Sequence, residues 1–318
     1  MILSVSRRTD IPNFYSEWFI NRIKEGFLYV RNPMNAHQIS RIDLSPEVID
    51  CIVFWSKNPT NMLDKLDELK GYQYYFQITL TGYGHDVEPG LPDKNEVLIP
   101  TFKKLSEKLG KKRVIWRYDP ILINEKYTKD YHYRAFEKIA AELKGYTERV
   151  VISFVDLYAK TQRNTAGLHI ENTSNEEMTE IAARLAEIAR DKGLIIESCA
   201  EVIDLDSVGV RHGHCIDKEL IEEIIGCKLK GDKDKNQRPE CGCFESVEVG
   251  TYNTCKNGCK YCYANYNQDR VISQTHLYDP KSPILCGVVD ENAGDKITNR
   301  AMKTLKEAQI SLYDIVDE

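Results

Sequence analysis

The sequence contains no apolar run that approaches the roughly 20 residues needed to span a bilayer. A secretory leader is not indicated either, because the opening MILSVSRRTDIP has its arginines after a short apolar run, whereas signal peptides carry basic residues before it. Internal repeats and long low-complexity tracts are also absent. We therefore expect a cytoplasmic protein with no membrane partner.

An excess of positive charge is missing as well. Lys and Arg number 43 against 49 Asp and Glu, and the formal net charge of -6 argues against a protein that wraps nucleic acid over its whole surface. A lysine-rich stretch, KLKGDKDKNQR at 228–238, leaves open a metal-stabilised nucleic-acid-binding or repair-associated module as an alternative. The 42% hydrophobic and 29% charged residues are typical of a globular protein with a substantial core.

A disulfide framework is not expected, because a chain of 318 residues can bury a core without such cross-links. Every cysteine except Cys51 falls after residue 198, and this clustering favours metal ligation in a reducing compartment. Cys255, Cys259 and Cys262 form the spacing C-x3-C-x2-C within TYNTCKNGCKYCYANY. Three thiolates so close together can hold three irons of a 4Fe-4S cluster and leave the fourth iron without a protein ligand.

Zinc is the alternative metal for these three cysteines, because similar spacings suit a tetrahedral site with Cys241 or Cys243 as the fourth ligand. The asymmetric spacing favours the cluster, since zinc ribbons use two matched C-x-x-C pairs. Cys199, Cys215, Cys241 and Cys243 supply four more thiols, which could ligate an auxiliary 4Fe-4S cluster or a structural zinc. Otherwise Cys199 is a small buried hydrophobe, and Cys241 and Cys243 border the first site.

Short apolar runs alternate with amphipathic segments along most of the chain. The strand-like runs are 2–6, 51–55, 74–80, 113–117, 149–155 and 194–199, and the helical segments include 18–23, 62–69, 102–109, 136–143 and 181–188. Strands joined by helices run parallel, and no dinucleotide fingerprint follows the first strand. We predict an α/β fold, a TIM-like (β/α) barrel or partial barrel over 1–226. Residues 227–318 would form a cysteine-rich iron-sulfur segment with a helical tail around 300–310.

The carboxyl ends of barrel strands build the active site, and the predicted strand ends are rich in charge. They carry Arg7, Arg8, Lys57, Arg117, Asp119 and Glu197. Arginine and lysine suit a carboxylate, a phosphate or the anionic end of a cofactor. The alternative is a set of structural ion pairs, in which Arg117 pairs with Asp119 or Glu197, and Arg7 with Asp10.

The string CKNGCKYCYA resembles the signature of the radical S-adenosylmethionine enzymes, in the version found in the spore photoproduct lyase group. Over its length the chain is also similar to an uncharacterised bacterial family, domain of unknown function 1848, through SRRTDIP, FWSKNP, WRYDPIL, SFVDLY and CGCFESVEVGTYNTC. The first resemblance implies an enzyme whose unique iron binds S-adenosylmethionine, which is cleaved reductively to a 5'-deoxyadenosyl radical that acts on an unknown substrate. It also implies a reductant such as flavodoxin or ferredoxin.

This resemblance implies a role for Tyr261, and the predicted strand ends supply the other candidate residues. Tyr261 would lie close to the adenine of the cofactor, with Arg8 and Glu197 as further cofactor-binding candidates. The catalytic candidates are Arg7, Lys57, Arg117 and Asp119. A zinc-dependent barrel hydrolase is a further alternative activity, which predicts a colourless protein.

The position of the cysteine motif departs from the radical S-adenosylmethionine pattern. Typical members carry the cysteine loop after their first barrel strand, whereas here it follows six strands. Either the barrel is rotated in sequence, so that 247–251 begins the cluster-bearing unit, or the loop is an appendage folded over the mouth of the barrel. We favour the appendage.

Overall fold

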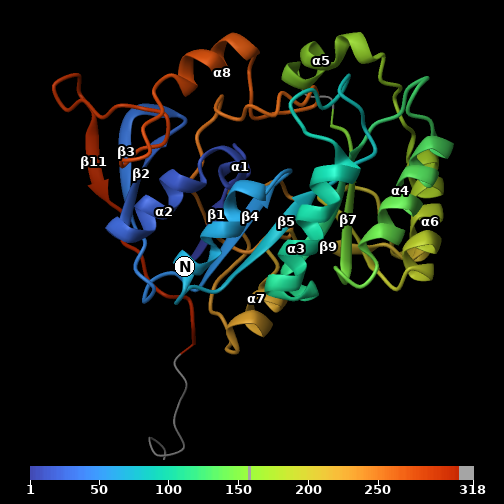
Figure 1. Ribbon diagram of the computed structural model, residues 1–318, viewed down its shortest axis with the longest axis horizontal. Helices are drawn as coiled ribbons and strands as arrows, with labels where there is room; N and C mark the ends of the chain where they lie inside the picture. Colours follow the sequence, from blue (N-terminus) through green and yellow to red (C-terminus); the bar gives the residue numbers. More distant parts are fainter. Residues whose placement is uncertain (157–158, 308–318) are drawn as a thin grey trace, which may run out of the picture.

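The computed structural model describes residues 1–156 and 159–307, and its centre is a sheet of eight parallel strands (Figure 1). In sheet order these are β10 (Val247–Glu248), β1 (Ile2–Val5), β4 (Cys51–Ser56), β5 (Tyr74–Thr79), β6 (Val114–Ile121), β7 (Arg149–Phe154), β8 (Ile195–Cys199) and β9 (Arg211–Gly213). The order follows the chain from β1 to β9, and β10 returns to pair with β1, with Leu3 opposite Val247. The strands thus follow a barrel-like ring in which β9 pairs with β8 and β10 pairs with β1, but β9 and β10, at the two ends of the order, do not pair with each other.

Helices cover one face of this sheet. The segments whose apolar side chains pack there are α1 (Ile11–Phe14), α2 (Ser16–Glu25), the 3-10 helix η1 (Thr60–Leu69), α3 (Ile99–Leu109), α4 (Lys129–Leu143) and α6 (Asn175–Asp191). A doubly wound sheet reverses its strand order and carries helices on both faces. The unreversed strand order, with the helices that connect the strands on one face, therefore fits the barrel-like form of the predicted α/β fold.

Further helical segments lie at the ends of the sheet and in the loops. They are α5 (Ala159–Thr165), α7 (Lys218–Ile225), α8 (Gln268–Thr275), the π-helical η2 (Lys94–Leu98) and the 3-10 turns η3 (Lys111–Arg113), η4 (Ala166–Leu168) and η5 (Asp206–Val208). Within the two described ranges, no helix combines the length and the apolar content that crossing a membrane requires.

Side chains of successive strand residues point to opposite faces, and this alternation builds two cores. Phe54, Phe76 and Trp116 pack on the outer side against helices, for example with Trp116 stacked on Phe136 of α4 at 4.7 Å between ring centroids. The inner side is lined by a second set of buried residues, Ile2, Cys51, Val53, Tyr75, Ile115 and Val151. The chain around α7 covers this inner set, and Leu220 contributes to it.

Local signals explain where the longest helix begins. Ser174 precedes α6 and forms a capping box with Glu177, because the serine side chain accepts from the backbone N–H of Glu177 and the glutamate accepts from the backbone N–H of Ser174. Apolar residues from Ile181 to Ile188 then recur on the buried side of the helix.

A smaller sheet flanks the barrel-like ring at the left of Figure 1. It consists of β2 (Phe27–Asn32), the antiparallel β3 (Asn35–Asp43) and β11 (Lys296–Asn299), which runs parallel to β3. The helical tail predicted around 300–310 is wrong for residues 300–307, where the chain forms no helix and Lys306 makes an antiparallel bridge with Leu229. Residues 308–310 of that prediction lie outside the described residues.

The six predicted strands are confirmed, but the preferred position of the cysteine loop is wrong. Val247–Glu248 is a strand of the main sheet, and the cysteine motif follows it directly. The loop is therefore carried by the ring itself, next to β1, as the rotated alternative requires. This pairing spans more than 240 residues of sequence and leaves no local pattern to detect. The domain boundary near residue 226 stays a prediction.

Candidate functional site

The loops that follow several strands meet on one side of the sheet, and the cysteine loop at 250–264 lies among them. In Figure 1 the orange chain that leads into α8 runs on the same side of the sheet as α5, away from the N-terminus. The N–H of Gly90 donates to the carbonyl of Asn257 at 2.9 Å, and the N–H of Lys260 donates to the carbonyl of Val87 at 2.9 Å. The cysteine loop is thus held by the loop after β5.

Asp10 ties three of these loops together. Its carboxylate accepts from the hydroxyl of Ser56 at 2.6 Å, from the N–H of Lys57 at 2.8 Å and from the side-chain amide of Asn257 at 3.0 Å. It also caps α1 by accepting from the N–H of Asn13 at 3.1 Å. Asp10 is 5% exposed, so one buried carboxylate joins the ends of β1 and β4 to the cysteine loop.

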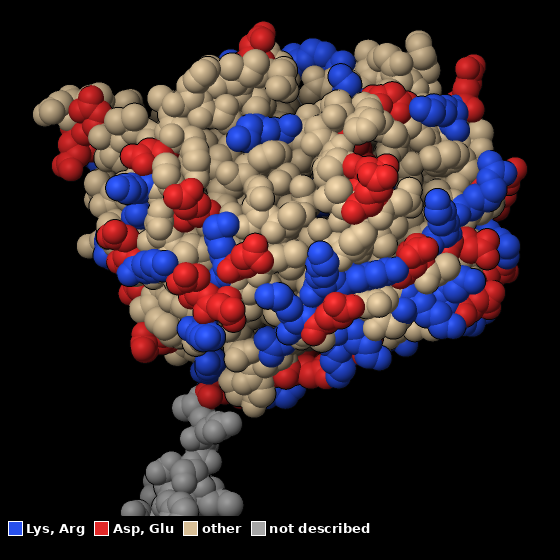
Figure 2. Space-filling view, viewed as in Figure 1, with Lys and Arg blue, Asp and Glu red and all other residues tan. Residues whose placement is uncertain are grey.

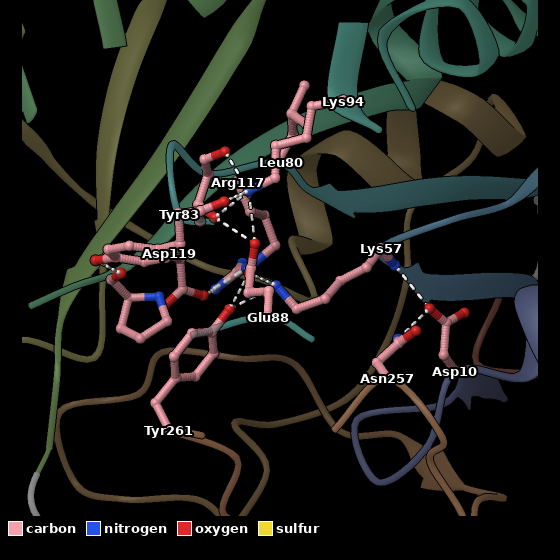
Figure 3. Close-up of polar contacts among 12 residues, drawn as sticks. Asp10, Lys57, Leu80, Tyr83, Glu88, Lys94, Arg117, Asp119, Asn257 and Tyr261 are labelled. Carbon is pink, nitrogen blue, oxygen red and sulfur yellow. Dashed lines mark hydrogen bonds and ion pairs between the residues drawn. The ribbon is translucent and has the colours of Figure 1, made fainter. Parts of the chain in front are cut away.

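A charged network centred on Glu88 lies beside this junction (Figure 3). One carboxylate oxygen accepts from the ammonium of Lys57 at 2.8 Å and from the hydroxyl of Tyr261. The other oxygen accepts from the ammonium of Lys94 at 2.7 Å and from the hydroxyl of Thr81 at 3.0 Å. Lys57 also donates to the Tyr261 hydroxyl at 2.7 Å. Lys57 therefore links two carboxylates, because its backbone N–H binds Asp10 and its side chain binds Glu88.

Burial and opposite charge set the protonation of this network. The side chain of Glu88 is only 1% exposed, and although burial disfavours its charge, Lys57 and Lys94 lower its pKa to about 2. Burial likewise opposes the charge of Lys57, but the Glu88 carboxylate outweighs it and the pKa of Lys57 is raised. For Lys94 burial prevails, and its pKa is lowered. Glu88 therefore stays ionised at neutral pH.

The guanidinium groups of two arginines lie close to the indole ring of Trp55, at the predicted strand end. The guanidinium carbons of Arg7 and Arg117 lie 5.7 Å and 5.4 Å from the centroid of the Trp55 ring. Arg117 is 5% exposed and makes a two-pronged ion pair with Asp119, which also accepts from Ser153. The structure thus brings Arg7, Arg117 and Asp119 together, and the alternative that Arg117 pairs with Asp119 is confirmed.

The three cysteines of the C-x3-C-x2-C motif lie in one loop, in which the N–H of Cys262 donates to the carbonyl of Cys259 at 3.1 Å. Burial, and then the neighbouring Cys262, raises the pKa of Cys255 to about 12. Burial also raises the pKa of Cys259, while the Lys57 ammonium acts in the opposite direction. Without a bound metal these buried cysteines are therefore thiols, and the Lys57 ammonium offsets only part of the effect of burial on Cys259.

Whether these cysteines can bind a metal depends on the donor atoms that they supply and on where those atoms lie. Within residues 1–156 and 159–307, no three His, Cys, Asp or Glu side chains are already placed to hold a metal ion. The loop nevertheless supplies three thiols, the donor type that a 4Fe-4S cluster uses, and Cys259 interacts electrostatically with the other two and with Lys57. These residues would be the protein ligands of such a cluster.

Two predicted cofactor-binding residues lie in different surroundings. Arg8 donates to the carbonyl of Gly250 at 3.3 Å, and its guanidinium carbon lies 4.8 Å from the ring centroid of Tyr252, so Arg8 contacts the cysteine loop. Glu197 instead pairs with Arg149 at 3.3 Å on the inner side of the sheet, and burial raises its pKa. The structure does not bring Glu197 to Tyr261.

The four further cysteines do converge. The sulfurs of Cys199 and Cys215 lie 2.8 Å apart, Cys215 interacts with Cys243, and Cys243 interacts with Cys241. They form a second thiol group, separate from the C-x3-C-x2-C loop.

Sequence reasoning missed Glu88, Lys94 and Trp55. Glu88 lies in the loop after β5 and Lys94 is the first residue of the short segment η2, and neither position has a periodicity that distinguishes a buried charge from a solvated one. Trp55 could have been found, because it precedes the polar end of β4 and alternates with Phe54, which faces the helices.

The lysine-rich stretch at 228–238 is partly engaged within the protein. Lys228 donates to Glu222 at 2.6 Å, and Arg238 pairs with Asp156. On the face shown in Figure 2, positive and negative side chains are intermixed over the lower half. Neither observation supports the nucleic-acid alternative.

The chain belongs to a family whose domain has no assigned function. The family model described as "Domain of unknown function (DUF1848)" matches residues 2–264, which extend from β1 through the cysteine loop. The resemblance to this family is thereby confirmed. No curated protein matches the chain.

Proposed function

We propose that this protein is a radical S-adenosylmethionine-type enzyme that acts on a substrate still to be identified. The observation that carries the proposal is the position of the C-x3-C-x2-C loop. It follows a strand of the parallel ring directly and packs against the loops after β1, β4 and β5. In barrel enzymes this edge of the strands is where the chemistry takes place.

The proposed cofactors are a 4Fe-4S cluster and S-adenosylmethionine. When bound, the cluster would supply the open iron and the electron that cleave S-adenosylmethionine to a 5'-deoxyadenosyl radical. Cys255, Cys259 and Cys262 would be its protein ligands. A flavodoxin or a ferredoxin is the class of reductant that such a cluster requires.

The surrounding residues would bind and orient the ligands. Lys57 is held by Glu88 and keeps its positive charge beside the cysteine loop, where it suits a carboxylate or a phosphate. Arg7 and Arg117 present guanidinium groups at the same end of the ring, and Asp119 holds the fork of Arg117. Tyr261 is the residue that would contact the adenine, with its hydroxyl fixed by Lys57 and Glu88.

The test is oxygen-free reconstitution with iron and sulfide, followed by reduction and addition of S-adenosylmethionine. We expect about four irons and four sulfides in the first site and release of 5'-deoxyadenosine. The Cys255→Ala/Cys259→Ala/Cys262→Ala variant should lose both, and the Cys227→Ser variant is the matched control. A loaded cluster that yields no 5'-deoxyadenosine with any reductant would refute the proposal, as would zinc bound by the three cysteines.

A further inference from the structure

Four thiols from three separate segments meet on the inner side of the ring. Cys199 ends β8, Cys215 follows β9, and Cys241 and Cys243 precede β10. Their contacts run from Cys199 through Cys215 and Cys243 to Cys241, with 2.8 Å between the first two sulfurs. Cys215, Cys241 and Cys243 are 4%, 7% and 1% exposed. This group is built from residues that are far apart in the sequence.

The surroundings of the thiols supply hydrogen-bond donors and positive charge. The guanidinium of Arg117 donates to the sulfur of Cys215 at 2.8 Å, and the backbone N–H of Ile216 donates to the sulfur of Cys243 at 3.4 Å. Arg7 also interacts electrostatically with Cys243 and Cys215. Hydrogen bonds from backbone and side-chain donors to the ligand sulfurs are the outer contacts that orient the ligands of a metal site.

A metal bound by these four thiols would have a structural role because of its location. The ring is interrupted between β9 and β10, and the chain between them crosses the interruption without strand pairing to either edge. The cysteines lie near both edges, because Cys199 ends β8 and Cys215 follows β9 by two residues, while Cys241 and Cys243 lie a few residues before β10. A metal bound to all four sulfurs would join the two edges.

We propose that Cys199, Cys215, Cys241 and Cys243 form a four-thiolate metal centre that closes the ring, holding either one zinc ion or a 4Fe-4S cluster. Both use four cysteine thiolates. Tetrahedral zinc at about 2.3 Å from each sulfur sets the sulfurs about 3.8 Å apart, so Cys199 and Cys215 separate when the metal enters. When zinc or a preassembled 4Fe-4S cluster binds, the thiols release their protons to solvent and the sulfurs keep their oxidation state.

Metal analysis of variants tests this centre independently of the proposed function. The Cys255→Ala/Cys259→Ala/Cys262→Ala variant, purified without oxygen, should retain about one zinc or about four irons per chain. The Cys241→Ser/Cys243→Ser variant should lose that metal and keep the first site, with Cys227→Ser as the control. The metal content of the first variant therefore tests the new centre whether or not the wild-type protein releases 5'-deoxyadenosine. If it folds as the wild type does, by circular dichroism, and holds no metal, the proposal is overturned.

A measurement on the wild-type protein covers the case in which the serine variant does not fold. Alkylation of the native protein, mapped by mass spectrometry, should leave the four cysteines unmodified until a chelator removes the metal. Equal alkylation before and after chelation would overturn the proposal. A disulfide between Cys199 and Cys215 in oxygen-free protein would overturn it as well.

Discussion

Replacing Glu88 by glutamine should destabilise the protein through the two lysines that it holds. Glu88→Gln preserves the shape of the side chain but leaves the ammonium groups of Lys57 and Lys94, 2.8 Å and 2.7 Å from the carboxylate, without their counter-charge. Breaking a buried ion pair in this way costs about 3–5 kcal/mol. We expect the free energy of unfolding at pH 7 to fall by about that amount.

The pKa of Glu88 gives a second measure of the same effect. A carboxyl whose pKa is lowered on folding from 4.5 to about 2 contributes about 3 kcal/mol, at about 1.4 kcal/mol per pH unit. Because the pKa is depressed in the folded state, this contribution is present above pH 4.5 and is lost as the pH falls towards 2. The difference between wild type and Glu88→Gln should therefore shrink in the same interval.

Urea unfolding at a series of pH values would measure both quantities. Exposed Glu96 provides the control, since Glu96→Gln should change the unfolding free energy by less than about 0.5 kcal/mol. A loss below about 1 kcal/mol at pH 7 for Glu88→Gln, or a difference from wild type that does not vary with pH, would show that Glu88 does not hold the two lysines.

Two further predictions concern a buried histidine and a close backbone contact. His132 donates from Nε2 to the carbonyl of Leu122 at 2.9 Å, and burial lowers its pKa to about 4, so the wild type should lose about 3 kcal/mol of unfolding free energy between pH 6.5 and pH 4. Urea unfolding should show that slope flattened in His132→Gln, and an unchanged slope would contradict the assignment. A Cβ on Gly90 would lie 2.6 Å from the carbonyl of Asn257, so Gly90→Ala should cost about 1–3 kcal/mol in thermal unfolding and reduce iron uptake by the cysteine loop. Gly167→Ala, whose Cβ meets nothing within 4 Å, is the control, and equal melting temperatures and iron contents for the two variants would contradict this reasoning.

Much of the architecture could be predicted because local sequence patterns indicate it. The six predicted strands are continuous apolar runs, and their order in the ring follows the chain, so no long-range information was needed to place them. The strand-end rule also brought Arg7, Lys57, Arg117 and Asp119 to one end of the sheet, because parallel strands present their carboxyl ends together.

The parts that could not be predicted depend on short or distant interactions. The strands β9 and β10 have three and two residues, too few for an alternation to be visible. The contacts of Glu88 with Lys57 and Tyr261 join residues separated by 31 and 173 positions. The hairpin β2–β3 was not predicted although it contains strand-forming residues, because it is an antiparallel pair and the β/α alternation predicts parallel strands only.

The pairing of β10 with β1 also has a consequence for biosynthesis. The free edge of β1 acquires its partner only when residue 247 has been translated, although the remaining strands of the sheet can assemble earlier. A nascent chain, or a product truncated before that point, exposes an unpaired strand edge that invites pairing with another molecule. The cysteine loop leaves the ribosome after this last strand, and it therefore meets loops that have already had time to fold.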